Sequence, residues 1–174
     1  MNPYVSDPEN IPASDIYTEV PFYGRYFPKA DDFQVDPQHI NSRSIDSLQY
    51  WASVVDLCNE SVRIYPAEEG GRDVFALGSV IVKSSHLHKT RDGRHYEIDY
   101  SYADANEVEA VALAKSVLKD FRVPEIYFAG KVLIFSDCIL MPLSLTSMQI
   151  NDCQVLIQER LPGVALNVVW PYLS

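Results

Sequence analysis

The residue whose type and position best fit a chemical role is Lys83, which ends the segment Val80–Lys83. In kinases, a lysine on an inner strand binds the phosphates of ATP, and a carboxylate from a helix holds that lysine in place. Because side chains alternate along a strand, Ile81 is expected on the same face as Lys83, where it would cover an adenine ring. The competing interpretation is a solvated lysine at a strand end, because long basic side chains often lie there.

The carboxylate that such a lysine needs is predicted in the next helix, where Glu107 is the first choice and Glu109 the second. On a helical projection Glu107 belongs to an apolar stripe that we expect to face the core. The other members of this stripe are Ala110, Ala114, Val117 and Phe121. A carboxylate there needs a cation, which favours a pair with Lys83. The competing interpretation is a capping box, Asp104-x-x-Glu107, in which Glu107 only reaches back to the start of the helix.

The elements that must position these residues are predicted from periodicity and from turn residues. Apolar residues at helical spacing after Ser44, a residue type suited to an N-cap, indicate a helix over 44–59. The segment 104–121 is rich in good helix formers and indicates the main helix, which Pro124 follows. Alternating and β-branched residues predict strands within 62–65, 74–83, 126–134 and 154–158. This order predicts an α+β fold with an antiparallel sheet.

Composition indicates one domain and excludes several partners. A chain of 174 residues that is 47% hydrophobic can bury one core, which we place in residues 44–174 behind an irregular, proline-rich arm over 1–43. The net charge of -10 argues against a nucleic acid or an anionic membrane as a partner. Three cysteines without CxxC spacing, together with the lack of a signal-like or membrane-spanning segment, favour the cytoplasm.

Four segments, taken in order, resemble the N-terminal lobe of fungal-type aminoglycoside phosphotransferases and choline-kinase-like proteins, which share the protein-kinase-like fold. The segments are Val74–Lys83, Asn106–Ala110, Val123–Gly130 and Leu156–Gly163. Each is unspecific alone, whereas the ordered set is more specific, because Asn-Glu-x-Glu-Ala lies in a helix that precedes a strand. The resemblance covers the chain from about Ser44 to its end and implies a kinase-like N-lobe.

This resemblance also implies a role for individual residues. Lys83 would contact the α- and β-phosphates of ATP, and Glu107 would orient it. The backbone at Glu159 and Leu161 would hold the edge of adenine, with Gln158 near the gatekeeper position. ATP is therefore the expected cofactor, and an unidentified small-molecule hydroxyl is the expected phosphate acceptor in the full-length family.

The chain also departs from this family. The family's catalytic Asp, the nearby Asn and the metal-binding Asp lie in a C-terminal lobe, and no histidine here begins the corresponding H-x-D motif. We therefore expect no catalytic residue and no metal site in this chain, with Mg²⁺ bound only when the missing lobe is present. The expected function is that of an N-lobe fragment that binds ATP without transferring phosphate.

A second departure is the segment 135–153, which is long and apolar where the family has a tight hairpin. We interpret it as an insert, with a translated intron or a gene-model error as the hypothesis for its origin. The alternative functions are a non-catalytic α+β protein-interaction module and a truncated gene product.

Overall fold

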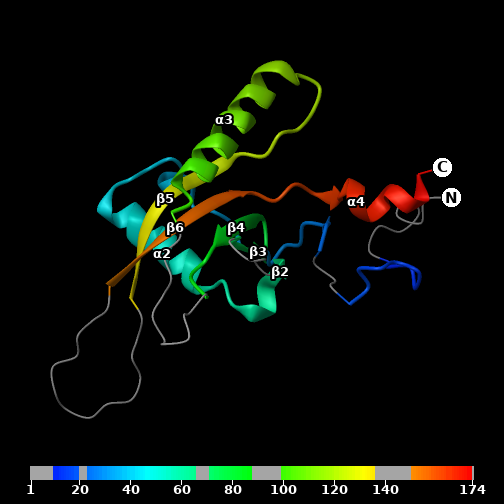
Figure 1. The fold of residues 1–174 in the computed structure, drawn as a ribbon, viewed down its shortest axis with the longest axis horizontal. Coiled ribbons are helices and arrows are strands. Elements are labelled where there is room, and N and C mark those ends of the chain that lie inside the picture. Colours follow the sequence, from blue (N-terminus) through cyan, green and yellow to red (C-terminus); the bar gives the residue numbers. More distant parts are fainter. Residues whose placement is uncertain (1–9, 20–22, 66–70, 88–98, 136–149, 174) are drawn as a thin grey trace, which may run out of the picture.

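The centre of the fold is a five-stranded antiparallel sheet in the order β2-β3-β4-β6-β5, shown in Figure 1. The computed structural model describes residues 10–19, 23–65, 71–87, 99–135 and 150–173. The strands are β2 (Arg63–Tyr65), β3 (Asp73–Leu77), β4 (Val80–Ser84), β5 (Ile126–Phe135) and β6 (Ile150–Glu159). The predicted α+β class with an antiparallel sheet is confirmed.

Helix α2 (Ile45–Asp56) covers one face of the sheet and forms the main core with it. It begins where predicted, because the Ser44 side chain accepts a hydrogen bond from the N–H of Ser47. Trp51 is fully buried and stacks on Phe128, with ring centroids 5.6 Å apart. Strand alternation sends every second side chain into this layer. The strand residues buried there include Phe75, Val80, Val82, Val155 and Ile157.

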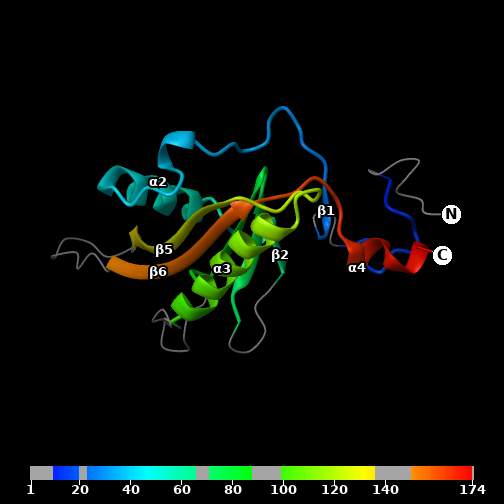
Figure 2. The ribbon, with the colours of Figure 1, turned by 90° about the horizontal axis from the view of Figure 1, so that it is seen from above.

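Helix α3 (Ser101–Val117) lies on the opposite side of β5 and β6 from α2, as Figure 2 shows. It begins at residue 101 rather than 104 and ends at 117 rather than 121. Its N-cap is Tyr100, which makes no side-chain capping bond. The capping-box interpretation of Asp104 and Glu107 is therefore wrong, because both residues lie inside the helix.

The apolar stripe predicted to face the core is also placed differently. Asp104 is the buried residue of α3, whereas Val117 and Phe121, at the far end of the predicted stripe, are 66% and 71% exposed. The physical reason is that the side chains of α3 that bind sheet residues, Asp104 and Glu107, lie in its first two turns. Its C-terminal half stands away from β2, β3 and β4 in Figure 1.

Strands β5 and β6 form a long hairpin that includes both ends of the predicted insert. Pairing continues to Phe135 opposite Ile150, beyond the strands predicted at 126–134 and 154–158. Residues 150–153 are therefore strand, and the remainder of the insert, 136–149, lies outside the described residues.

The described part of the arm forms short elements, although the sequence predicts an irregular segment over 1–43. Strand β1 (Arg25–Tyr26) pairs with β7 (Gly163–Val164) in a separate two-stranded sheet. The remaining short helices are η1 (Pro37–His39), η2 (Glu60–Val62), α4 (Leu166–Val169) and η3 (Trp170–Tyr172). Val168 and Val169 pack with Tyr17 and Tyr23 of the arm in a small second core. The arm and the segment after β6 therefore pack on each other.

Candidate functional site

Lys83 and Glu107 form an ion pair, with Nζ of the lysine facing Oε1 of the glutamate. Their side chains are 24% and 29% exposed, so protein surrounds most of the pair while solvent still reaches it. Lys83 belongs to β4 and Glu107 to the second turn of α3, so the pair links the helix to the middle of the sheet. The pair that the sequence predicts is present, and the second choice, Glu109, is exposed.

The local reason for this placement is the alternation along β4. Val80 and Val82 are fully buried in the core beneath α2. Ile81 and Lys83 are half-buried and lie on the other face, the one that α3 approaches. In the ladder with β6, Ile81 lies opposite Gln158. One face of the sheet therefore carries Lys83, Ile81 and Gln158 together.

A cavity of about 430 Å³, here called the hinge pocket, lies where β4 begins and β6 ends, beside Ile81. Its lining includes Ile81, Gln158, Glu159 and Leu161, which are four of the six residues predicted to bind the nucleotide. The other two are Lys83 and Glu107, which are not part of the lining. The volume falls in the range of about 300–1,000 Å³ that is usual for small-molecule sites.

Gln158 brings an unsatisfied polar atom to this pocket. Its Oε1 is buried and has no hydrogen-bond partner among the described residues. A buried acceptor without a donor destabilises the folded state by about 1–3 kcal/mol, so such an atom calls for a physical explanation. Gln158 lines the hinge pocket, but this oxygen has almost no exposed surface, so a ligand donor would reach it only after the side chain rotates toward the pocket.

The backbone at the end of β6 and just after it offers one acceptor and one donor. The N–H of Glu159 donates to the carbonyl of Glu125 at 2.8 Å, so its own carbonyl is the group that could receive a ligand. The carboxylate of Glu159 is engaged with Arg122 and with the N–H of Glu125. The N–H of Leu161 donates to no acceptor in the part of the chain that the structure describes.

The arm supplies residues of the hinge pocket that sequence reasoning missed, namely Gly24, Arg25 and Tyr26, and β2 supplies Ile64. Arg160 holds the arm, because its Nη2 donates to the carbonyl of Arg25 at 2.6 Å. Its guanidinium lies 4.5 Å from the centroid of the Tyr26 ring. Burial and a hydrogen bond to Asp32 raise the pKa of Tyr26 to about 12, so the phenol stays neutral. No local pattern in a proline-rich segment signals these distant contacts.

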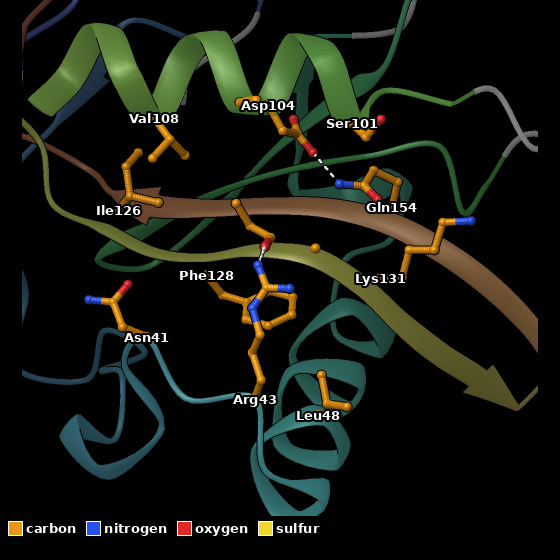
Figure 3. Close-up of a pocket in the computed structure, with 13 residues that line it drawn as sticks. Asn41, Arg43, Leu48, Ser101, Asp104, Val108, Ile126, Phe128, Lys131 and Gln154 are labelled. Carbon is orange, nitrogen blue, oxygen red and sulfur yellow. Dashed lines mark hydrogen bonds between the residues drawn. The ribbon is translucent and has the colours of Figure 1, made fainter.

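A larger cavity, about 630 Å³, lies between α3 and β5 and contains none of the predicted site residues. Figure 3 shows it as an open space with Val108 and Ile126 facing each other across one end. Arg43 donates a hydrogen bond to the carbonyl of Ala129 at 3.0 Å. Despite its size, this α3–β5 pocket is the weaker nucleotide candidate, because none of the six predicted residues lines it, whereas four of them line the hinge pocket.

A further polar cluster joins β4 to the end of α2. Ser84 Oγ lies 3.0 Å from His86 Nδ1 and 3.1 Å from Cys153 Sγ. His86 Nε2 lies 2.6 Å from the carbonyl of Cys58, so Nε2 carries the proton and Nδ1 accepts from Ser84. A serine beside a histidine can act as a nucleophile. Here Ser84 is fully buried, which keeps substrates from its hydroxyl and makes the cluster a structural link.

Within the described ranges, no group of three or more His, Cys, Asp or Glu residues is arranged to hold a metal ion. Likewise, no helix in those ranges has the length and apolar character needed to cross a membrane. Comparison of the chain with protein-family models, with curated proteins and with solved structures gives no match.

Proposed function

We propose that this chain is the ATP-binding lobe of a kinase-like small-molecule phosphotransferase, related to the aminoglycoside-phosphotransferase type. In this proposal Lys83 holds the α- and β-phosphates and Glu107 orients it. Ile81 covers the adenine ring. The carbonyl of Glu159 and the N–H of Leu161 meet the adenine edge.

The observation that carries the proposal is the Lys83–Glu107 ion pair, formed between the inner strand β4 and helix α3. Kinases require such a pair between a strand lysine and a helix glutamate to place the phosphates of ATP. Ile81 is two residues from Lys83 on the same face, about 6.6 Å along the strand, and it lines the hinge pocket. A nucleotide could therefore place its base in the pocket and its phosphates at the lysine.

The unsatisfied oxygen of Gln158 supports the adenine end of the proposal. Adenine presents a hydrogen-bond donor, its exocyclic amino group, next to a ring-nitrogen acceptor. Gln158 Oε1 and the carbonyl of Glu159 are acceptors for the amino group, and the N–H of Leu161 is a donor for the ring nitrogen. The pocket thus offers groups complementary to the polar edge of adenine.

The proposed activity is nucleotide binding rather than phosphate transfer. Transfer needs a residue that positions the acceptor hydroxyl and carboxylates that hold Mg²⁺. The sequence has no H-x-D motif followed by Asn at the kinase spacing. Lys83 and Glu107 by themselves would hold the phosphates in place without providing these groups.

The test is a fluorescence titration with trinitrophenyl-ATP, followed by displacement with unlabelled ATP. We expect saturable binding to the wild-type protein. A charge-assisted hydrogen bond contributes about 1.5–3 kcal/mol. Lys83→Met should therefore raise the Kd about 10- to 150-fold. Lys119→Met is the matched control, because Lys119 is exposed after α3 and its replacement changes the net charge equally.

Two results would contradict the proposal. If wild-type protein shows no saturable binding, the chain is not an ATP-binding lobe. If binding is saturable but Lys83→Met and Lys119→Met behave alike, the phosphates lie elsewhere. Circular dichroism of each variant establishes that a lost signal does not come from unfolding.

A second candidate function, a non-catalytic interaction module, is favoured by a different observation. Leu113, Val117 and Phe121, along and just after α3, are all more than half exposed. Exposed apolar residues that gather on one element commonly mark a protein contact. The same titration separates the two candidates, because an interaction module has no reason to bind ATP through Lys83.

A further inference from the structure

Charged and polar side chains in the first two turns of helix α3 bind it to the sheet. Asp104 is its buried residue, and Glu107 is the half-buried partner of Lys83. Farther along, Leu113 and Val117 are exposed. The position of Glu107 over the sheet therefore depends on the contacts that hold the N-terminal end of α3.

Asp104 makes two strong contacts with the sheet. Its Oδ1 receives a bond of 2.5 Å from Nη1 of Arg72, the residue immediately before β3. Its Oδ2 receives a bond of 2.7 Å from Nε2 of Gln154 in β6, which is the dashed line beneath α3 in Figure 3. Asp104 is 2% exposed, so both bonds lie where water competes little. The three side chains form a unit, here called the α3 clamp.

Arg72 is itself held in one orientation. Its guanidinium lies 4.9 Å from the centroid of the ring of Tyr100, the N-cap residue of α3. The hydroxyl of Tyr100 donates to the carbonyl of Gly71 at 2.5 Å. Burial raises the pKa of Tyr100, so this hydroxyl remains a donor at neutral pH. The clamp therefore joins the helix start to β3 and to β6, the two strands that flank β4.

The register of the sheet explains why the clamp affects Glu107. Ser84 lies opposite Asp73 in β3 and opposite Val155 in β6. Arg72 and Gln154 are the next residues beyond these two, so each lies two residues along the strand direction from Lys83. Two residues along a strand span about 6.6 Å, and the three residues from Asp104 to Glu107 rise about 4.5 Å along the helix. Holding Asp104 beside Arg72 and Gln154 therefore brings Glu107 beside Lys83.

We propose that Asp104 is a positioning residue for the nucleotide site. Together with Arg72 and Gln154 it sets Glu107 against Lys83, and so it tunes the affinity of Lys83 for phosphate without touching the nucleotide. This inference rests on the proposed function for its effect on ATP, while its effect on the Lys83–Glu107 pair stands without it.

The first test is a double-mutant cycle on the Kd for trinitrophenyl-ATP. Glu107→Gln should weaken binding about tenfold, and Asp104→Ala should weaken it by a similar factor. If Asp104 acts through Glu107, Asp104→Ala should change the Kd less than twofold in the Glu107→Gln background. An equal loss in both backgrounds would overturn the proposal, because Asp104 would then act by another route.

The second test needs no nucleotide. In protein labelled with ¹³C at the lysine ε carbon, the resonance of Lys83 is assigned with Lys83→Arg. It should shift in Asp104→Ala toward its position in Glu107→Gln, and it should stay unchanged in Asp120→Ala, which removes an exposed carboxylate after α3. If Asp104 has only a structural role, Asp104→Ala lowers the unfolding midpoint and leaves the Lys83 resonance unchanged. That result would refute the positioning role.

Gln154→Met provides a second test of the clamp in case Asp104→Ala does not fold. It removes one donor of the clamp, keeps the length of the side chain and leaves the Arg72 contact in place. The Lys83 resonance should shift in the same direction as in Asp104→Ala, by a smaller amount. If wild-type protein binds no nucleotide, the proposed function fails, and the resonance still decides for or against the clamp. If nucleotide binds but the resonance stays fixed in both variants, the clamp alone fails.

Discussion

Replacing Trp51 by alanine tests how much the packing of α2 on the sheet stabilises the fold. Helix α2 packs on the face opposite to the one that carries Lys83. Trp51 has no exposed surface and stacks on Phe128 with ring centroids 5.6 Å apart. Its Nε1 donates to the carbonyl of His39 at 3.2 Å. Trp51→Ala therefore leaves a large cavity and one carbonyl without its donor. The matched control is Trp170→Ala, because Trp170 is 66% exposed.

The expected magnitudes of these two substitutions differ strongly. Replacing a buried tryptophan by alanine lowers the free energy of unfolding by about 3–5 kcal/mol. An exposed position changes it by about 0.5 kcal/mol or less. With a urea m-value of about 2 kcal/mol per M, Trp51→Ala should lower the unfolding midpoint by about 2 M. The midpoint is read by circular dichroism, and Trp51→Phe should give a smaller loss if the alanine variant is unfolded.

Fluorescence checks the same placement without destabilising the protein. In Trp170→Phe the remaining fluorophore is Trp51, which should emit at short wavelength and resist quenching by acrylamide. Equal losses of stability in the two alanine variants, or rapid quenching of Trp51, would refute the placement of α2 against the sheet. The site on the other face would then lose its structural basis.

Two further predictions concern burial elsewhere in the chain. Burial raises the pKa of the Cys58 thiol from 9.0 to about 12, so its contribution to stability is complete below pH 9.0 and is lost as the pH rises toward 12. Cys58→Ala should flatten that alkaline decline in urea midpoints, and an unchanged slope would contradict the burial. The ion pair of Asp15 and Arg25 has side chains 1% and 4% exposed, so Asp15→Asn should destabilise the arm by about 3–5 kcal/mol. Hydrogen exchange should then quicken in β1 and β7 while α2 stays protected, and uniform protection would disprove the role of this pair.

Several features of the fold could be predicted because they follow from local rules. The helical spacing after Ser44 and its capping hydroxyl locate α2, since both depend on residues within one turn of each other. The alternation of Val80 to Lys83 assigns Ile81 and Lys83 to one face, since the period of a strand is fixed by its backbone. The same rules predicted a strand at 154–158, which lies within β6.

The first turn of α3 shows where local rules stop. Asp104 and Glu107 fit a capping box by spacing, yet each binds a different strand of the sheet. The helix begins at Ser101, and its N-cap Tyr100 makes no side-chain capping bond, so tertiary contacts override the local pattern. The exposure of Val117 likewise depends on how far α3 extends past the sheet, which its own sequence does not encode.

By itself, the sequence determined the α+β class, the helix that follows Ser44 and the shared face of Ile81 and Lys83. Only the tertiary structure decided that Asp104 is clamped by Arg72 and Gln154. It also decided that the arm lines the hinge pocket through Tyr26. The physical reason is distance along the chain: periodicity and caps act within a few residues. The clamp and the arm join segments whose meeting depends on the register of the whole sheet.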